Sequence, residues 1–570
     1  MDGLRIRLRR ILGRDGDANL NRARRRKTLV SAISQRVTFL RLVLLLAGYI
    51  WMLALPSSQL GRGIYIDENA LQPGQVNTYW SWGDVYNSDR YLEQLELLRD
   101  SNATSQQRAH YLTTEFRKTG IFTSTQNYSF TGASQATNGT NVYGILSSPR
   151  APGAEAIIIS ASWLSRTNEG DGTLNLRGVA IVLALAKFLK QYSLWAKDLV
   201  FVISDGYLDG MQAWLNAYHG SVQSNLHADK LEMTSGVVWT ALNIDYPGHS
   251  FSHLGVFYEG LNGRLPNQDL MNSFHVISSR MGVPVILYDH LDPRNIPERR
   301  HELDWLPGWL PKALRDHSDV RAYAYNALNV WRHIKYQASG RGSGVHGLFH
   351  QFRIDAFTIF ALPATGPHGF HALGRVIEST LRTTNNLLER LHASFFFYIM
   401  TGPSRFLKIG SFLPSAVLVS VAMMFGGLKE WVDSAWAQEH SDDKSAGAQT
   451  WTRRPRPVLR TLTIMIATHF WGLAIYLLMT SRWSLHSSAG LPLTLILSSV
   501  FVFCVPLLSP NGNADGAAPL SSVLKALNLR FLGIDFGNPV VHQLPIQEHG
   551  FTADEMLLVS VAELGMGSET

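Results

Sequence analysis

The side chains that could do chemistry stand where three apolar runs of the sequence end. The run at 156–160 leads into the letters SASWL, the run at 199–204 ends at Asp205 and Gly206, and the run at 237–244 ends at Asp245. Short apolar runs that alternate with segments of helical spacing are typical of parallel βαβ units. In such sheets ligands bind in the crevice at the carboxyl ends of the strands. The three ends therefore predict a crevice like that of a hydrolase.

The stretch 155–215 resembles the di-zinc aminopeptidase and carboxypeptidase fold, but the residues that would serve the metals are replaced. Where active members carry a His and an Asp, and later two Glu, this chain has Ser162, Leu164, Tyr207 and Leu208. The loop GTLNLRG also lacks the bridging carboxylate. Two cations held about 3.5–4 Å apart need several carboxylates and imidazoles, so the sequence argues against a two-metal peptidase. Asp245 alone stands at a ligand position, which predicts at most one divalent cation there, Mg²⁺ or similar.

Four histidines near these ends stay unassigned. His249, His253, His346 and His368 lie beside Gly, Ser or Pro, and isolated histidines in such surroundings are more often surface groups than ligands. Asp245 itself has a structural alternative, which is to cap the loop that follows it.

Four apolar segments are long enough to cross about 30 Å of hydrocarbon. They are 37–55, whose one charge is Arg41, and 411–428, 461–480 and 491–508. Buried core helices remain the alternative for the three later segments. The first segment follows a long basic leader and precedes no clear cleavage site, which favours an uncleaved signal anchor.

Charge and glycosylation signals predict the topology. The leader carries the run RARRRK at 22–27, and the loop at 452–460 is also basic. The positive-inside rule places both in the cytosol, so the segment 56–390 is expected in a lumen. Glycosylation sequons at Asn102, Asn127 and Asn138 all fall in that segment. The net charge of +7 is therefore explained by topology, and we expect no nucleic-acid partner.

The cysteine count limits what the segment 56–390 can be. Cys504 is the single cysteine and lies in an apolar segment, so the lumenal part has no disulfide, zinc–cysteine site or cysteine nucleophile. A segment of this length can be stabilised by its own core. We predict an α/β domain with a mostly parallel central sheet and helices on both faces, joined to an α-helical multi-span membrane region.

The expected organisation follows the chain in order. It comprises a basic cytosolic N-terminus (1–36), a signal-anchor helix (37–55), a peptidase-like domain (56–390), an interfacial helix end (391–410), three spans with a cytosolic loop at 429–460 (411–508), and an irregular tail (509–570). Within the domain, helical spacing is expected over 88–118 and 369–392, and a Ser/Thr/Asn-rich exposed loop over 123–140. The loop at 61–75 and the aromatic segment at 394–400 should both lie at the lumenal leaflet, where they could face one lipid head group.

Three further blocks extend the resemblance to a membrane family. They are IYIDENAL (64–71), ASGRGSGVHGLFHQFRIDAFTIFAL (338–362) and GRVIESTLRTTNNLLERLHASFFFYIM (374–400). With the basic leader and the degenerate peptidase domain, the chain resembles the GPI-anchor-attachment subunit of the GPI transamidase complex over roughly 20–480. The end of the chain departs from that family, which continues through more spans, so a truncated tail or a faulty gene model is expected there.

The resemblance implies a multi-pass, non-proteolytic subunit of the endoplasmic reticulum membrane. It would bind and present the GPI lipid, whose ethanolamine amine is joined to precursor proteins after a caspase-like cysteine protease subunit forms a thioester. The lipid head group would meet Tyr65, Asp67, His392, Ala393 and Ser394.

Each of these assignments leaves a structural alternative open. Tyr65 could be an interfacial anchor, Asp67 a turn cap, and the His392 ring a partner of a backbone carbonyl. Two other functions also stay open, namely a single-metal catalyst of amide formation that uses Asp245, and a cargo-binding scaffold unrelated to GPI.

Overall fold

The computed structural model describes residues 18–67, 71, 77–131, 136–167, 170–291, 311–392, 397–439, 450–453, 455–456 and 458–479. The chain divides into two compact units. One comprises Met1–Ala54 and Gly410–Gln547, and the other comprises Leu55–Ile409 and Glu548–Thr570.

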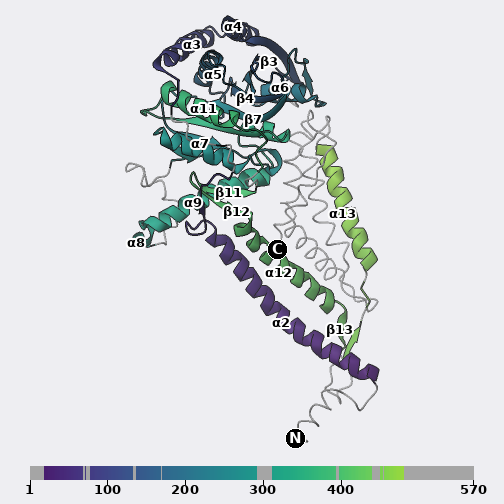
Figure 1. Ribbon diagram of the computed structural model, residues 1–570. Coiled ribbons are helices and arrows are strands. Elements are labelled where there is room, and N and C mark those ends of the chain that lie inside the picture. Colours follow the sequence, from purple (N-terminus) through teal and green to yellow (C-terminus); the bar gives the residue numbers. More distant parts are fainter. Residues whose placement is uncertain are drawn as a thin grey trace. The chain divides into compact units, whose positions relative to one another are not determined.

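The second unit is built on a nine-stranded sheet of order β6-β2-β3-β5-β4-β7-β10-β8-β9 (Figure 1). Its four central strands run parallel: β5 (Asp198–Ser204), β4 (Glu155–Ser162), β7 (Val237–Asp245) and β10 (Asp355–Pro363). The strands β3 (Ala136–Leu146), β2 (Phe122–Thr131) and β6 (Leu226–Ala228) extend one side in antiparallel fashion. On the other side β8 (Phe251–Phe257) pairs antiparallel with β10, and β9 (Val285–Leu287) runs parallel to β8.

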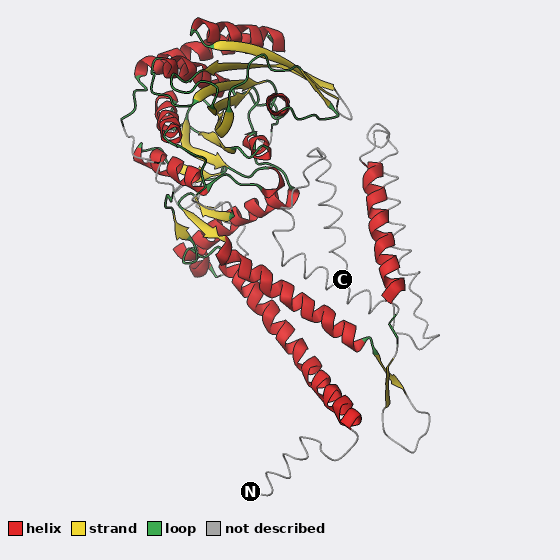
Figure 2. Cartoon of the chain, turned by 45° about the vertical axis from the view of Figure 1, so that its right-hand side comes forward, coloured by secondary structure: helices red, strands yellow, loops and turns green. Residues whose placement is uncertain are grey.

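Helices cover both faces of this sheet, as Figure 2 shows. One core cluster joins Ile157 and Ile159 of β4 to α3 (Trp82–Asp100), α4 (Ser105–Lys118), α5 (Leu176–Lys190), α7 (Gln268–Arg280) and α11 (Phe370–Asn385). The other joins Ile158 to α6 (Asp209–His219) and α10 (His346–Gln351). Successive residues of a strand face opposite sides, so the central strands, covered on both faces, are buried and mainly apolar. The predicted α/β class is confirmed.

Two local predictions were wrong. The expected helix over 88–118 is two helices, because Thr104 begins α4 with a capping box. In this box Gln107 N–H donates to Thr104 Oγ1 at 3.3 Å, and Thr104 N–H donates to Gln107 Oε1 at 2.8 Å. The expected loop over 123–140 is largely the β2–β3 hairpin. Exposed and buried residues alternate along most of β2, and this period-2 pattern outweighs the polar composition.

A separate three-stranded sheet of order β1-β12-β11 lies in the same unit. It is formed by β1 (Arg62–Gly63), β11 (Tyr398–Gly402) and β12 (Arg405–Lys408), and Arg62 pairs with Phe406. The expected helix end at 391–410 is therefore a β-hairpin over 398–408, and the helix expected to reach His392 ends at Asn385. The helices α8 (Lys312–Arg315) and α9 (Ser318–Ser339) and the 3₁₀ turn at Leu261–Gly263 complete the described part of this unit.

The first unit contains α2 (Ala18–Ala54), α12 (Ile409–Asp433), α13 (Val458–Met479) and a hairpin of β13 (Trp436–Glu439) and β14 (Thr450–Arg453). Within the described residues, Arg36–Ala54, Ile409–Asp433 and Val458–Leu478 are long and apolar enough to cross a membrane. They overlap three of the predicted spans, whereas 491–508 and the tail 509–570 lie outside the described residues. A Cβ on Gly48 of α2 would lie 2.8 Å from Val419 Cγ2 of α12, so a small residue lets these two helices approach closely.

The packing of α11 against Trp80 generates a stability prediction. A Cβ on Gly374 would overlap the indole of Trp80, which is buried and packs edge-on against Phe188 at 5.3 Å. We expect Gly374→Ala to destabilise the fold by ~1–3 kcal/mol through overpacking, although alanine favours a helix. Thermal and urea unfolding measure the effect. Gly83→Ala in α3, where the nearest atom would be Ser81 Oγ at 3.5 Å, is the control, and equal stability of the two variants would contradict the prediction.

Candidate functional site

Asn175 holds together the strand ends at the centre of the predicted crevice. Its Nδ2 donates to the carbonyl oxygens of Ser162 and Ile244, both at 3.0 Å. Its Oδ1 accepts from the N–H of Tyr246 at 2.7 Å and of Gly178 at 3.2 Å. All the hydrogen-bonding capacity of the amide is therefore used. The loop in which a bridging carboxylate is expected thus contains a neutral clamp between β4, β7 and α5.

The end of β4 is bonded to the chain that follows β5. Ser162 Oγ donates to the Tyr207 carbonyl at 3.0 Å and accepts from Ser204 Oγ at 2.9 Å, while Leu164 pairs with Leu174 in an isolated bridge. Among the described residues, no group of three or more His, Cys, Asp or Glu side chains is placed to hold a metal. The resemblance to a degenerate peptidase-like domain agrees with this geometry.

Asp205, the acid at the end of β5, is paired with α4. Its Oδ1 accepts from Arg108 Nη2 at 2.9 Å, and its Oδ2 accepts from Ser105 Oγ. The Arg108 guanidinium also lies 4.6 Å from the centre of the Trp163 ring. The carboxylate therefore anchors a helix to the sheet edge.

Asp245 is the remaining candidate ligand. Its Oδ2 accepts from Arg166 N–H at 2.7 Å, and its Oδ1 is buried without a hydrogen-bond partner among the described residues. Burial raises the pKa of Asp245 to about 6. Divalent cations such as Ca²⁺ and Mg²⁺ take six or more oxygen ligands from ionised groups and water, so one part-protonated carboxyl fits a cation poorly. The single-cation assignment stays a prediction.

A buried polar cluster lies close to Asp245 and was not predicted from the sequence. The Arg166 side chain lies against Phe257 with its Cζ 3.4 Å from the ring centre, and its Nε donates to Ser343 O at 3.3 Å. Ser343 in turn donates through its N–H to Glu259 O at 2.9 Å. The one sequence feature that could have indicated this cluster is the acidic residue Glu259 within the apolar run GVFYEG at 255–260.

Glu259 is fully buried and held by hydroxyl and imidazole groups. Tyr288 OH donates to its Oε1, and His333 Nδ1 lies 3.2 Å from the same oxygen. Burial acts to raise the pKa of Glu259, but the hydrogen bonds from His333 and Tyr288 outweigh it and the pKa lies below its ordinary value. The His346 ring is also fully buried and lies 3.0 Å from Glu259 O, so its expected place on the surface was wrong.

The segment around Tyr65 is bound to the small sheet and to α7. The Tyr65 ring lies 5.9 Å from the Phe406 ring and 4.9 Å from Lys408 Nζ. The Tyr65 carbonyl accepts from Asn272 Nδ2 at 2.8 Å. Asp67 N–H donates to both carboxylate oxygens of Asp269, at 3.1 and 3.2 Å. The backbone is therefore held in place while the Asp67 side chain is exposed.

Three of the five predicted lipid contacts, Tyr65, Asp67 and His392, lie within the described residues. His392 is exposed, with Nδ1 3.0 Å from Arg390 O and Nε2 3.9 Å from Glu389 Oε1, and the described contacts do not join it to Tyr65 or Asp67. Ala393 and Ser394 lie outside the described residues. The lipid-contact assignments remain predictions, and the backbone contact of His392 agrees with its structural alternative.

The three sequons are exposed. Asn102 has a φ of 49° just after α3, and Asn138 lies on β3. Asn127 Nδ2 donates to Asp229 Oδ2 at 3.1 Å, a bond that an attached glycan would compete with. Glycosylation at these positions stays a prediction.

Comparison with known proteins decides the family. Residues 138–534 match the family described as Gaa1-like, GPI transamidase component. The chain belongs to this family. It is similar to the GPI transamidase component gaa1 of Schizosaccharomyces pombe, with 29% identity over 408 residues that make up 70% of this chain and 65% of that protein. The GPI transamidase component GAA1 of Saccharomyces cerevisiae is 29% identical over 421 residues, which are 72% of this chain and 60% of that protein.

Solved structures with a distant likeness include two bacterial enzymes. A glutaminyl cyclase of Fimbriiglobus ruber has a TM-score of 0.33 and 14% identity, over 56% of this chain and 98% of that one. The LapA aminopeptidase of Legionella pneumophila has a TM-score of 0.34 and 13% identity, over 57% of this chain and 78% of that one. At these scores the likeness adds nothing to the fold described above.

The raised pKa of Asp245 generates a pH-dependent prediction. The folded-state pKa is about 6, whereas an unfolded Asp titrates near ~3.9. Ionisation of the buried carboxyl therefore destabilises the folded state. The free energy of unfolding falls progressively as the pH rises above about 4, and the full loss is present above about pH 6. We expect Asp245→Asn to stabilise the protein at pH 7 by ~1–3 kcal/mol and to leave stability below pH 4 unchanged.

Thermal unfolding of the two proteins over this pH range measures the difference. Asp67→Asn, at an exposed position, is the control. If a cation bound at Asp245, the wild type would instead be the more stable protein in Mg²⁺ and would lose that advantage in EDTA.

Proposed function

We propose that the chain is a non-proteolytic subunit of the GPI transamidase. It binds the GPI lipid and presents it so that the ethanolamine amine is joined to the C-terminus of precursor proteins. The observation that carries this proposal is the family match over residues 138–534. The chain spans 65% and 60% of the lengths of the two curated relatives, so the activity, substrates and partners of the whole protein belong to the proposal.

The proposed setting is the endoplasmic reticulum membrane. The N-terminus lies in the cytosol, and the unit that carries the nine-stranded sheet lies in the lumen. Its partners are the other subunits of the complex, including a caspase-like cysteine protease subunit, together with precursor proteins and the lipid. The three helices that could span a membrane and the basic run at 22–27 support this arrangement through the positive-inside rule.

The strand ends support a role without proteolysis. Asn175 uses its amide to join strands, and Asp205 is paired with Arg108. A protein-bound hydroxide needs a metal or a general base to form at neutral pH. At the described strand ends these side chains make structural contacts, and the proposal assigns bond cleavage to the caspase-like subunit.

The Tyr65 segment supports a role in presentation. In sequence, β1 follows the first candidate span and β12 runs directly into the second, which puts this small sheet at a membrane boundary if both helices span. The Tyr65 ring offers an aromatic face beside the Lys408 ammonium, and Asp67 offers an exposed carboxylate. A sugar or phosphate of a head group suits the ring and the ammonium, and an ethanolamine ammonium suits the carboxylate.

Depletion and rescue test this proposal. Cells that lack the protein are expected to lose surface GPI-anchored reporter and to accumulate the uncleaved precursor. Wild-type protein restores anchoring, whereas Tyr65→Ala and Asp67→Asn each restore it several-fold less efficiently. Their level in the membrane should stay normal, because the Asp67 bonds to Asp269 are made by the backbone.

Tyr86→Ala on α3, a tyrosine that is 70% exposed, is the matched control and should rescue fully. Normal anchoring in depleted cells would exclude the proposed function. Full rescue by both Tyr65→Ala and Asp67→Asn would exclude a role of the Tyr65 segment in presenting the lipid.

A further inference from the structure

The larger unit contains a cavity that the proposed function does not use. It has a volume of about 520 Å³ and is lined by α3, the start of α5, the loop after β7, the end of α7 and the start of α11. This volume lies in the range of cavities that bind small molecules. Tyr246, next to Asp245 in sequence, forms part of the wall, so the cavity lies at the carboxyl edge of the parallel strands. No described residue of 61–67 or 391–408 lines it.

Two arginines give the cavity its charge. Arg177 of α5 and Arg375 of α11 both line it, and neither forms an ion pair with another described residue. The Arg177 guanidinium is held beside two aromatic rings, 5.8 Å from the centre of Tyr246 and 5.6 Å from that of Phe370. Arg375 Nε donates to Thr78 Oγ1 at 3.0 Å, which fixes the direction of its side chain. A guanidinium presents several donors to an anion.

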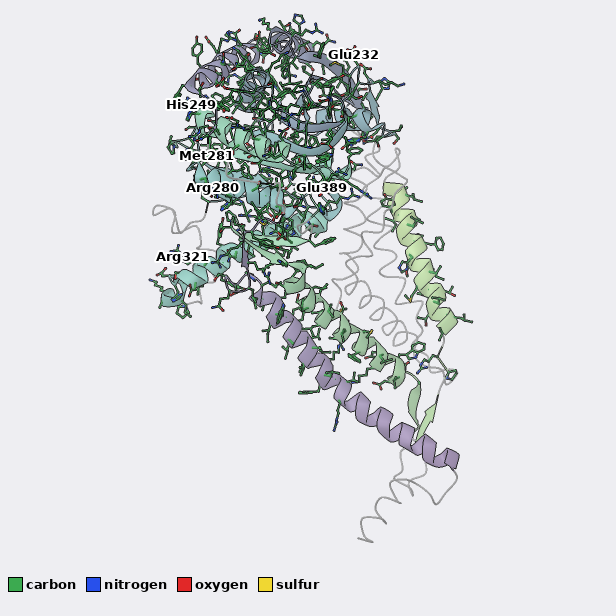
Figure 3. All side chains as sticks on the ribbon, in the orientation of Figure 1. Glu232, His249, Arg280, Met281, Arg321 and Glu389 are labelled. Atoms are coloured by element: carbon green, nitrogen blue, oxygen red, sulfur yellow. The ribbon has the colours of Figure 1, made fainter. Side chains whose placement is uncertain are left out.

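The residues that line the cavity carry little negative charge. Asp89 is the one acidic residue among those that line the cavity. Burial lowers the pKa of His368, and burial together with Arg375 lowers the pKa of His371. These two rings are therefore neutral at pH 7, and the permanent positive charge comes from the arginines. His249 and Met281, which also line the cavity, are labelled along one margin of the unit in Figure 3.

The wall also offers backbone donors. Phe370, His371 and Ala372 begin α11 and line the cavity, and the N-cap residue Gly369 supplies no side-chain hydrogen bond. The first N–H groups of this helix of 16 residues therefore add to the donors of the two arginines, and a helix N-terminus favours an anion.

An aromatic platform stands beside these donors. The Trp82 indole is 71% exposed and stacks on His371, with ring centres 4.5 Å apart and planes 8° from parallel. An exposed indole that is held flat by a second ring offers one face to a ligand. Sugars and other rings pack on such faces, and the cavity is much larger than a single phosphate requires.

We propose that this cavity binds a phosphate ester carried on a sugar-sized ring. The phosphate oxygens take the donors of Arg177, Arg375 and the start of α11, and the ring packs against Trp82. A phosphate is favoured over a carboxylate because the donors form three groups on two helices, namely the Arg177 guanidinium of α5 and the Arg375 guanidinium and first N–H groups of α11, and a phosphate has more oxygens to share among them. The ligand is either a soluble sugar phosphate or the head group of a phospholipid such as phosphatidylinositol. This site is separate from the Tyr65 segment and does not depend on the proposed function.

Direct binding to the full chain in detergent tests the proposal. The probes are glucose 6-phosphate, glucose, inorganic phosphate and micellar phosphatidylinositol, followed by ³¹P NMR line broadening for the phosphates and by thermophoresis for all four. We expect glucose 6-phosphate or phosphatidylinositol to bind more tightly than inorganic phosphate, and glucose to bind at least tenfold more weakly than glucose 6-phosphate. Binding of glucose 6-phosphate assigns a soluble ligand, and binding of phosphatidylinositol alone assigns a lipid head group.

Substitutions locate the binding. Arg177→Gln and Arg375→Gln should each weaken binding about tenfold or more, since each removes charge-assisted hydrogen bonds, and Trp82→Ala should weaken the ring-bearing probes more than inorganic phosphate. Arg117→Gln on α4 and Trp331→Ala on α9, both exposed and outside the cavity, are the matched controls. Absence of binding by every phosphate probe, equal binding of glucose, or equal loss in the control variants would overturn the proposal. Thermal unfolding of each variant separates loss of fold from loss of the site.

Discussion

The side-chain amide of Asn175 is the contact on which the centre of the larger unit depends. It joins the ends of β4 and β7 and the first turn of α5 through four hydrogen bonds, at a place where backbone groups would otherwise be buried without partners. A buried polar group that is fully satisfied stabilises one arrangement, whereas an unsatisfied one costs ~1–3 kcal/mol. An amide can both donate and accept here, which a carboxylate could not do. The strand ends are therefore organised by a neutral residue.

This neutral clamp changes what the neighbouring acids can do. Where a metal pair would stabilise several ionised carboxylates close together, each acid here must be stabilised separately. Asp205 is paired with Arg108, and the carboxylate of Glu259 is stabilised by the Tyr288 hydroxyl and the His333 imidazole. Asp245 has no equivalent partner for its second oxygen, and burial raises its pKa to about 6. The polar groups at these strand ends thus hold helices and loops in place.

The small sheet shows how the same unit can still present a surface of defined shape. Segments that are more than 300 residues apart in sequence, 62–63 and 405–408, pair as strands, and the intervening α7 fixes the Tyr65 segment through Asn272 and Asp269. The backbone of this segment is held by buried partners, which fixes the points from which the Asp67 side chain and the Tyr65 ring project.

Local patterns in the sequence determined the α/β class, the parallel central strands, the candidate spans and the loss of the metal ligands, because period, length and residue type at strand ends are local properties. The sequence blocks at 64–71, 338–362 and 374–400 also indicated the family. Composition misled at 123–140, where polar residues lie on a paired strand, and at 391–410, where residues 398–408 form a β-hairpin instead of a helix end.

Only the tertiary structure decided which polar residues meet. Asn175, Arg166 and Glu259 look ordinary in sequence, and their roles arise from partners that lie far away along the chain. The cavity lined by α3, α5, α11 and the loop after β7 is likewise formed by segments that are distant in sequence. Burial and hydrogen-bond partners are set by chain topology over long separations, whereas the sequence by itself determined only the elements that this topology brings together.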